Sequence, residues 1–493
     1  MGILARQTLL NTVLTYAGIG LGFVNVVLLY PKILESDQFG LTRLLISITV
    51  VAAQLSQLGV ENTVLRFFPY FKDAGRKHRG LLGMLVLFGA AISLASMFVL
   101  ALLHPWLSEV FSDRNSLYAE YGLLVLPLVL GEIFFILLRS YSRSLGRTVQ
   151  PTFIREFLLR SLQTLLILIQ AWVQFPFHVF MALYTALFLV STVLLILDLY
   201  RSGNLSLGWS ERWLPKRLRR SMVTYSTFTF SATLAGILLG NIDQLMIGAL
   251  LGDGLRQVAY YSVAFYFGSV IAAPGRALSQ GALPLIAEAW KRNDRPYIAE
   301  LYRRSSLILL LVSGFLFLVM WLSVDDLFML LPAEYTKAAE VAVVIGAAYL
   351  MTSSIGLSVG IISMSKSYRL DAISSLTMLI VNLVADYFFI LEFGIIGAAY
   401  ATFLALFVVN AYRTWFLYKR YGLWPYELRT LGVLALMVAI GILVPWIPFT
   451  GHLLPDLVLR VVLVTVLFWP VAFLFGTMPE LKGVIAQFTR RLK

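Results

Sequence analysis

Long apolar segments dominate the chain and decide which folds it can adopt. Its 493 residues contain about fourteen runs of roughly twenty mostly apolar residues, separated by short polar connections. A helix of this length spans the hydrocarbon core of a bilayer, which is about 30 Å thick. The residues are 59% hydrophobic and 13% charged, whereas a soluble domain is about half apolar and about a quarter charged. The sequence therefore predicts an all-α integral membrane protein. The expected spans are 8–30, 40–60, 81–103, 121–143, 151–173, 177–200, 221–250, 258–287, 305–323, 338–362, 370–391, 395–418, 426–447 and 456–476.

The basic residues are distributed unevenly among the connections. Most of the 39 Lys and Arg residues fall in one alternate set, for example in 72–79, 201–220 and 291–304. Arg155 and Arg413, near the ends of two predicted spans, are counted with the connections of this set. The opposite set carries few basic residues, among them Lys32 and Lys337, and is rich in acids. Cytoplasmic connections of membrane proteins are enriched in Lys and Arg, so both termini are predicted to be cytoplasmic. The net charge of +13 then reflects topology, and no nucleic-acid partner is expected.

Several kinds of chemistry are excluded by what the sequence lacks. There is no cysteine, which excludes disulfides, iron–sulfur clusters and thiolate zinc sites. The four histidines are scattered, and no Gly-Lys-Ser/Thr element is present to hold the phosphates of ATP. No connection is long enough to hold a soluble catalytic domain. We therefore expect a secondary transporter without a cofactor, rather than an enzyme such as a membrane glycan polymerase or ligase.

The two halves of the chain resemble each other at an offset of about 220 residues. Leu-Ser-Gln at 55–57 recurs at 278–280, and Leu-Tyr-Arg at 199–201 corresponds to Leu-Tyr-Lys at 417–419. Both halves start on the same side, which predicts parallel repeats, with a transport site between them near the membrane midplane. The predicted domains are an N-terminal lobe at 1–205, a basic cytoplasmic linker at 206–220, a C-terminal lobe at 221–420 and two accessory helices with a tail at 421–493.

Three stretches carry a family resemblance. Residues 241–248 read Asn-Ile-Asp-Gln-Leu-Met-Ile-Gly, residues 260–264 read Tyr-Tyr-Ser-Val-Ala, and residues 393–402 read Phe-Gly-Ile-Ile-Gly-Ala-Ala-Tyr-Ala-Thr. They resemble the polysaccharide transporters, including the O-antigen-type lipid-linked oligosaccharide flippases, of the multidrug/oligosaccharidyl-lipid/polysaccharide (MOP) flippase superfamily. The resemblance covers essentially the whole chain. It implies about fourteen transmembrane helices, in two six-helix lobes plus two C-terminal helices.

The resemblance also implies a function. A flippase of this kind lies in the bacterial plasma (inner) membrane and moves an undecaprenyl-pyrophosphate-linked glycan from the cytoplasmic to the outer leaflet by alternating access. Its expected partners are this glycan, the membrane lipids and a glycan polymerase of the same pathway. Two other members of the superfamily stay open as alternatives, a lipid II flippase and a multidrug/cation antiporter.

Four polar residues in the predicted spans are candidates for contact with the pyrophosphate and sugars of the substrate head group. Arg276, which follows a Pro-Gly pair, and Arg43 suit the pyrophosphate. A guanidinium makes bidentate charge-assisted bonds to phosphate and stays charged when it is desolvated. Gln57 and Gln280 occupy equivalent positions of the repeat and suit sugar hydroxyls. The alternatives are a buried ion pair or snorkelling for the arginines, and hydrogen bonds between helices for the glutamines.

Acidic residues within the spans form a second group of candidates. Asp243 and Asp386 lie in apolar segments, where a carboxylate is costly unless it is paired or functional. Each is predicted either to bind a coupling ion, Na⁺ or H⁺, or to form part of a gate through an ion pair.

Four more charged residues predict ion pairs with a structural role. Glu132 and Arg160 lie at similar depth when 1.5 Å is counted per residue from the inner ends of their neighbouring helices. Arg139 and Glu156 match in the same way, one level nearer the cytoplasm. Two stacked interhelical pairs are therefore expected, Glu132 with Arg160 and Arg139 with Glu156.

Overall fold

The chain is helical throughout the part that the structure describes. The computed structural model describes residues 3–73, 77–111, 117–205, 215–447 and 453–472, and at some helical positions, including Gln280, only the backbone. Within these residues there is no β-strand. Ten of the described helices are long and apolar enough to cross a membrane, or eleven if the bent pair Ala333–Ser354 and Ser358–Met364 counts as one span. The predicted all-α membrane fold is confirmed.

The predicted spans agree with the helices in position but not always in length. A helix lies over each of the fourteen predicted spans within the described residues, while the number that cross the membrane stays a prediction. One helix continues from Leu81 to Phe111 through Pro105, so part of the expected connection at 104–120 is helical.

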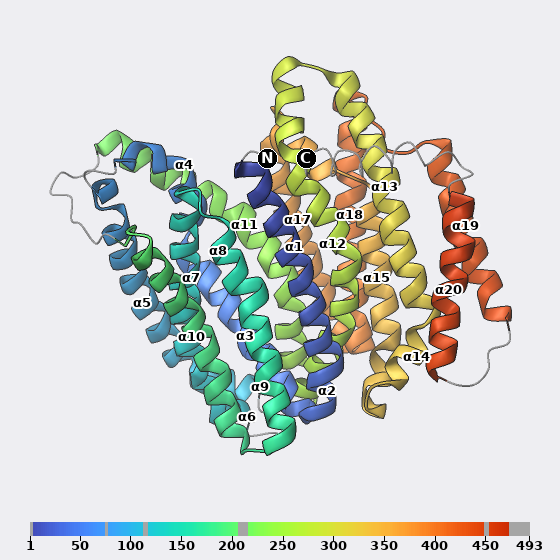
Figure 1. Cartoon of the computed structure of the whole chain (residues 1–493), viewed down its shortest axis with the longest axis horizontal. Helices are drawn as coiled ribbons and strands as arrows, with labels where there is room; N and C mark the ends of the chain where they lie inside the picture. Colours follow the sequence, from blue (N-terminus) through green and yellow to red (C-terminus); the bar gives the residue numbers. More distant parts are fainter. Residues whose placement is uncertain (1–2, 74–76, 112–116, 206–214, 448–452, 473–493) are drawn as a thin grey trace. The chain divides into compact units, whose positions relative to one another are not determined.

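The chain divides into two compact units, and the first comprises Arg6–Ala259 (Figure 1). In this unit α3 packs against α5, α7 and α11, and α7 packs against α4 and α10. Two π-helical turns, Val24–Leu29 and Phe153–Leu158, interrupt the first and the fifth predicted spans. The helices are α1 (Ile3–Phe23), α2 (Tyr30–Ile33), α3 (Ser36–Gln57), α4 (Val60–Phe71), α5 (Leu81–Phe111), α6 (Leu117–Tyr121), α7 (Val125–Ser144), α8 (Val149–Thr152), α9 (Leu159–Val173), α10 (Phe177–Arg201) and α11 (Lys216–Leu250).

The boundary between the units differs from the predicted lobe boundary. The sequence placed α11 in the C-terminal lobe, whereas in the structure α11 packs along α3 and α4 and the first unit extends to Ala259. The reason lies in polar contacts that the apolar pattern does not reveal. Ser47 Oγ donates to Gln244 Oε1 at 2.8 Å, and Ser226 Oγ donates to the carbonyl of Leu58 at 2.6 Å.

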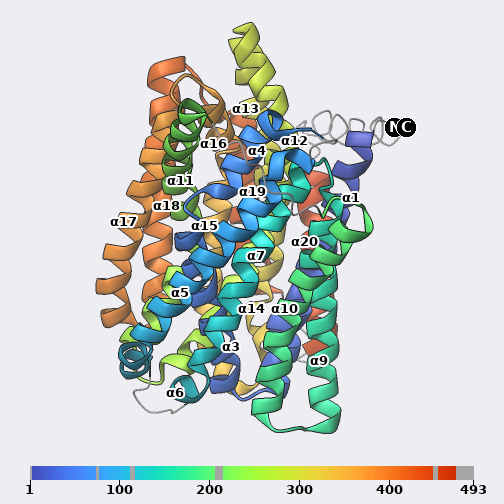
Figure 2. The same ribbon diagram turned by 90° about the vertical axis from the view of Figure 1, so that its left-hand side faces the viewer.

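The second unit begins at Tyr260, and its long helices also run alongside one another (Figure 2). A hairpin of α17 and α18 turns at Gly394, whose φ of 68° suits a residue without a Cβ. Helix α15 packs against α13 and α18, and α13 contacts both α19 and α20. The helices are α12 (Gly254–Arg292), α13 (Arg295–Leu322), α14 (Val324–Met329), α15 (Ala339–Ser354), α16 (Ser358–Met364), α17 (Tyr368–Phe393), α18 (Ile395–Tyr421), α19 (Leu428–Leu443) and α20 (Leu453–Ala472).

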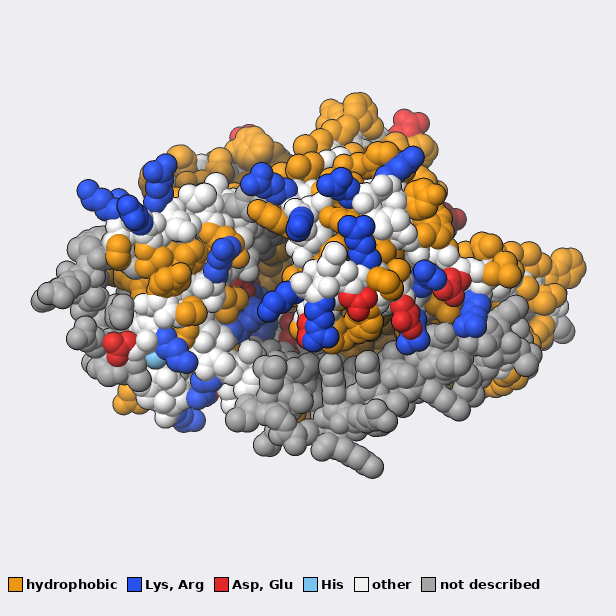
Figure 3. All heavy atoms as spheres, turned by 90° about the horizontal axis from the view of Figure 1, so that it is seen from above, with side chains coloured by type: hydrophobic (Ala, Val, Ile, Leu, Met, Phe, Trp, Pro, Cys, Tyr) orange, Lys and Arg blue, Asp and Glu red, His pale blue; other side chains and the backbone are white. Residues whose placement is uncertain are grey.

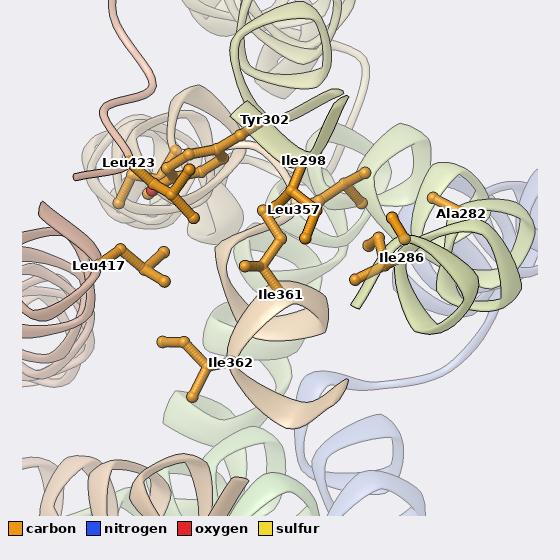
Figure 4. Packing of buried hydrophobic residues seen from close by; sticks show 11 residues of the cluster. Ala282, Ile286, Ile298, Tyr302, Leu357, Ile361, Ile362, Leu417 and Leu423 are labelled. Carbon is orange, nitrogen blue, oxygen red and sulfur yellow. The ribbon is translucent and has the colours of Figure 1, made fainter. Parts of the chain in front are cut away.

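A buried cluster fixes one end of the second unit. Ile286 of α12, Tyr302 of α13, Ile361 of α16 and Leu417 of α18 are all fully buried in it (Figure 4). Leu423, which follows α18, packs into the same cluster. These contacts hold the beginning of α13 and the segment before α19 in fixed positions. Lys and Arg side chains gather at this end of the helices (Figure 3).

Candidate functional site

Arg43 is an arginine within a membrane span of the first unit. It lies in α3, half-buried, and its Nε is buried without a hydrogen-bond partner among the described residues. Among those residues, no carboxylate pairs with it. Tyr30 and Tyr184 lie close enough for the guanidinium charge to act on both phenols. A guanidinium offers five N–H donors and no acceptor, so this side chain is free to bind an anion.

Glu132 forms an ion pair, but with a partner that differs from the predicted one. Arg155 Nη2 donates to Glu132 Oε2, and only 10% of the Glu132 side chain is exposed. The Arg155 guanidinium also lies 5.2 Å from the ring centre of Phe135 and 5.3 Å from that of Phe188, within cation–π distance. Arg155 was expected in a cytoplasmic connection, and the structure makes it the buried partner instead.

The other predicted pairings are also replaced. Arg160 pairs with Glu156 at 3.0 Å on its own helix, and it donates to the carbonyl of Gly18 in α1 at 2.6 Å. Arg139 pairs at 2.9 Å with Glu61 of α4. The depth estimate assumed an uninterrupted α-helix. The π-helical turn Phe153–Leu158 changes which side chains face α7, because a π-helix has more residues per turn.

Gln57 is enclosed by protein in this conformation. Its Nε2 donates to Gln54 Oε1 at 2.5 Å, and both residues are at most 2% exposed. This hydrogen bond lies within α3, whereas the expected alternative to a sugar contact was a hydrogen bond between helices. A role of Gln57 toward substrate stays a prediction. Asp243 is also buried, next in sequence to Gln244, which accepts from Ser47.

Arg276 is an arginine within a membrane span of the second unit. It lies in α12 within the membrane span Gly254–Ser279, yet its side chain is exposed. Its Nη2 donates to the carbonyl of Ser269 at 2.7 Å, about two helical turns earlier, and no carboxylate among the described residues pairs with it. Gln280 was predicted to contact the substrate head group, but its side chain is outside the described part of the structure.

A buried polar pair lies on α17 of the second unit. Asn382 and Asp386 are one turn apart, and both are 0% exposed. Neither the amide oxygen nor the amide nitrogen of Asn382 has a hydrogen-bond partner among the described residues. An amide and a carboxylate at this spacing offer oxygen ligands for a hard monovalent cation. Among the described residues there is no cluster of three or more His, Cys, Asp or Glu residues fit for a metal ion.

Arg413 of α18 is a charged residue whose burial the sequence did not indicate. It was expected in a cytoplasmic connection, but it is 6% exposed and donates to Asp371 at 3.0 Å and to Ser374 at 3.1 Å. The sequence contained a signal for this burial. A polar stretch from Asp371 to Ser375 lies opposite Arg413 on the hairpin of α17 and α18. Arg155, Arg160, Arg413 and Arg460 each pair with a carboxylate. Arg43 and Arg276 differ from them in having none among the described residues.

Part of the chain is similar in sequence to known proteins. The MatE family model matches residues 230–388. Among curated proteins, an uncharacterized membrane protein of Methanocaldococcus jannaschii is 24% identical over 56% of this chain and 55% of its own length. The probable low-salt glycan biosynthesis flippase Agl15 of Haloferax volcanii is 25% identical over 39% of this chain and 40% of its own. The chain thus spans about half the length, or less, of the curated relatives it matches.

Solved structures show the same fold. The lipid II flippase MurJ, in an inward closed conformation, superposes with a TM-score of 0.70 at 13% identity, covering 97% of this chain and 100% of its own. An inward-facing multidrug resistance MATE transporter of the MOP superfamily superposes with a TM-score of 0.61 at 14% identity, covering 83% and 94%. The chain therefore has a MurJ/MATE-like fold.

Proposed function

We propose that the chain is a flippase that carries an undecaprenyl-pyrophosphate-linked oligosaccharide from the cytoplasmic to the outer leaflet by alternating access. One observation carries this proposal. Arg43 and Arg276 lie in membrane spans, and neither has a carboxylate partner among the described residues. An unpaired charge at membrane depth is costly and marks a substrate pathway. A pyrophosphate is an anion whose oxygens match the guanidinium fork.

The likeness to named relatives supports a lipid-linked substrate. Agl15 is named a glycan biosynthesis flippase, and MurJ a lipid II flippase. The lipid II alternative is favoured by the near-complete coverage of the MurJ structure. The multidrug alternative receives less support from Arg43 and Arg276, because their guanidinium groups attract anions rather than a cation substrate. Loss of the gene should cause lipid-linked sugars to accumulate in the cytoplasmic leaflet, and analysis of their composition separates a glycan repeat unit from lipid II. Unchanged lipid-linked sugars together with a gain in drug sensitivity would favour the multidrug function.

The membrane potential can supply the driving force. About two negative charges moving outward gain roughly 4–5 kcal/mol per 100 mV of inside-negative potential, at about 2.3 kcal/mol per charge. This motion needs no nucleotide, in keeping with the absence of a phosphate-binding loop from the sequence.

Replacing Arg276 with alanine tests the head-group contact. Loss of charge-assisted hydrogen bonds worth about 1.5–3 kcal/mol should lower the flipping rate by about tenfold or more. The Arg276→Lys variant keeps the charge but loses the bidentate fork, so we expect an intermediate rate. Arg295→Ala, at the exposed start of α13, is the matched control and should flip at the wild-type rate. Wild-type flipping by Arg276→Ala, with normal protein level, would remove Arg276 from the pathway.

We further propose that Asn382 and Asp386 bind the coupling ion. The proposal rests on their complete burial and on the unpartnered amide of Asn382. The Asp386→Asn variant should abolish the acceleration of flipping by an imposed Na⁺ gradient, or by a pH gradient if the ion is H⁺, while the response to membrane potential remains. Asn410, a buried amide already bonded to Thr352 at 3.0 Å, offers the control Asn410→Ser. An Asp386→Asn protein that responds to both gradients like wild type would contradict ion binding here.

A further inference from the structure

A charged pocket lies at one end of the second unit, between the start of α13 and the start of α19. Its volume is about 300 Å³, and it is lined by Glu300, Arg303, Arg304, Leu307, Glu427 and Arg429. Three arginines against two glutamates leave the lining with a net positive charge. The proposed transport pathway uses none of these residues.

The pocket is held in place by the buried cluster at this end of the unit. Tyr302, directly before the two α13 arginines, is fully buried in that cluster, and Leu423 packs there four residues before Glu427 (Figure 4). Leu307, one turn further along α13, is 4% exposed. Both walls of the pocket are therefore anchored by apolar packing, while the arginine heads stay accessible.

The two glutamates neutralise the arginines only in part. Arg304 pairs with Glu300 on its own helix, and both side chains remain more than half exposed. Arg303 Nη1 lies 3.5 Å from Glu427 Oε1, which is long for a charge-assisted hydrogen bond. Glu427 is occupied elsewhere, because its carboxylate accepts the backbone N–H of Thr430 in the capping box that begins α19. Arg303 thus keeps N–H donors for another anion.

An apolar stripe continues from the pocket along the membrane span of α19. Leu428 is 85% exposed, and Leu431, Val438 and Ile442 follow on the same helix, each about 60% exposed. Their spacing of three, seven and four residues places them along one side of a helix of 3.6 residues per turn. An anion bound among the arginines would have this apolar surface directly below it.

We propose that this pocket binds the phosphate of an anionic membrane phospholipid, with the acyl chains of the lipid lying along α19. The combination of a basic pocket at the membrane surface and an apolar stripe on the adjoining helix matches the two parts of such a lipid. The α13 arginines belong to the basic connections, so the lipid is expected in the cytoplasmic leaflet. The site is separate from Arg43 and Arg276, and it stands whether or not the proposed substrate is correct.

Native mass spectrometry of the purified full chain tests this site with phosphatidylglycerol as the probe and phosphatidylcholine as the zwitterionic comparison. Wild type should retain phosphatidylglycerol preferentially, and Arg303→Gln/Arg304→Gln should weaken that retention by about tenfold or more. Glu300→Gln should strengthen it, because it removes a competing carboxylate. Arg292→Gln is the matched control, since Arg292 is an exposed arginine in the same kind of pair, with Glu288, outside the pocket.

Two further measurements complete the test, the unfolding temperature of each variant and competition by inorganic phosphate. Each variant must unfold at the same temperature as wild type, so that weaker lipid binding cannot be explained by a loss of folded protein. Inorganic phosphate is added as a competitor, and displacement of the lipid at equal concentration would show that the pocket recognises free phosphate rather than a lipid. Equal retention of the two lipids, or an unchanged preference in the Arg303→Gln/Arg304→Gln variant, would overturn the proposal.

Discussion

Replacing Gly40 with alanine should destabilise the first compact unit by about 3 kcal/mol, the upper part of the range for overpacking. Gly40 lies in the first turns of α3, and a Cβ built on it would be 1.7 Å from the carbonyl oxygen of Leu255 and 2.5 Å from its carbonyl carbon. Real Cβ contacts essentially never lie under 3.0 Å, and here the obstacle is backbone rather than a flexible side chain. The helix must therefore move away from the start of α12.

The measurement is the thermal unfolding midpoint of the purified protein in detergent. Gly20→Ala provides the matched control, because a Cβ at Gly20 in α1 has nothing within 4 Å. Alanine there should stabilise slightly, by roughly 0.5–1 kcal/mol, through its better helix propensity. Equal midpoints for the two variants would mean that α3 does not approach Leu255 this closely.

Removing the charge of Glu132 should destabilise the same unit by about 3–5 kcal/mol. The Glu132→Gln variant leaves Arg155 charged, with only 20% of its side chain exposed and its carboxylate partner gone. Breaking a buried pair from one side is costly because the remaining charge is desolvated and uncompensated. The double variant Glu132→Gln/Arg155→Gln removes both charges. Its loss of unfolding free energy should therefore be smaller than the sum of the losses in the two single variants.

Denaturation of the single and double variants measures this coupling. Glu288→Gln is the control, since it breaks an exposed pair with Arg292 and should change the free energy of unfolding by at most about 1 kcal/mol. Additive losses in the double variant would indicate that Glu132 and Arg155 do not interact. A Glu132→Gln loss rescued by removing Arg160 instead would restore the pairing expected from sequence.

The apolar segments were sufficient to place the helices, because a membrane span needs about twenty apolar residues whatever its neighbours. They were not sufficient to decide which way a side chain faces. Glu132 and Arg160 were matched by depth, but a π-helical turn changes the register and Arg155 takes the place of Arg160. Arg413 was assigned to a connection by its charge, although its carboxylate partner Asp371 allows it to be buried.

The sequence also could not predict which residues that are far apart in the chain lie close together in the structure. The assignment of α11 depends on contacts such as Ser47 with Gln244, which lie 197 residues apart. The pocket on α13 likewise requires Arg303 to meet Glu427, 124 residues away. Arg43 and Arg276 could be selected from sequence because arginine is rare within apolar spans. That both lack a carboxylate partner among the described residues could be learned only from the structure.

Flipping by the purified chain in proteoliposomes tests the central proposal most directly. The vesicles contain an undecaprenyl-pyrophosphate-linked oligosaccharide, and a membrane-impermeant sugar-modifying enzyme added outside reports how much of it reaches the outer leaflet. Wild type should make sugars from the inner leaflet accessible over time, faster when the membrane potential favours movement of the anion outward. The Arg43→Ala/Arg276→Ala variant should be slower by well over tenfold, because two charge-assisted contacts are lost. Accessibility in wild-type vesicles no greater than in protein-free vesicles, or equal to that of the double variant, would contradict the account.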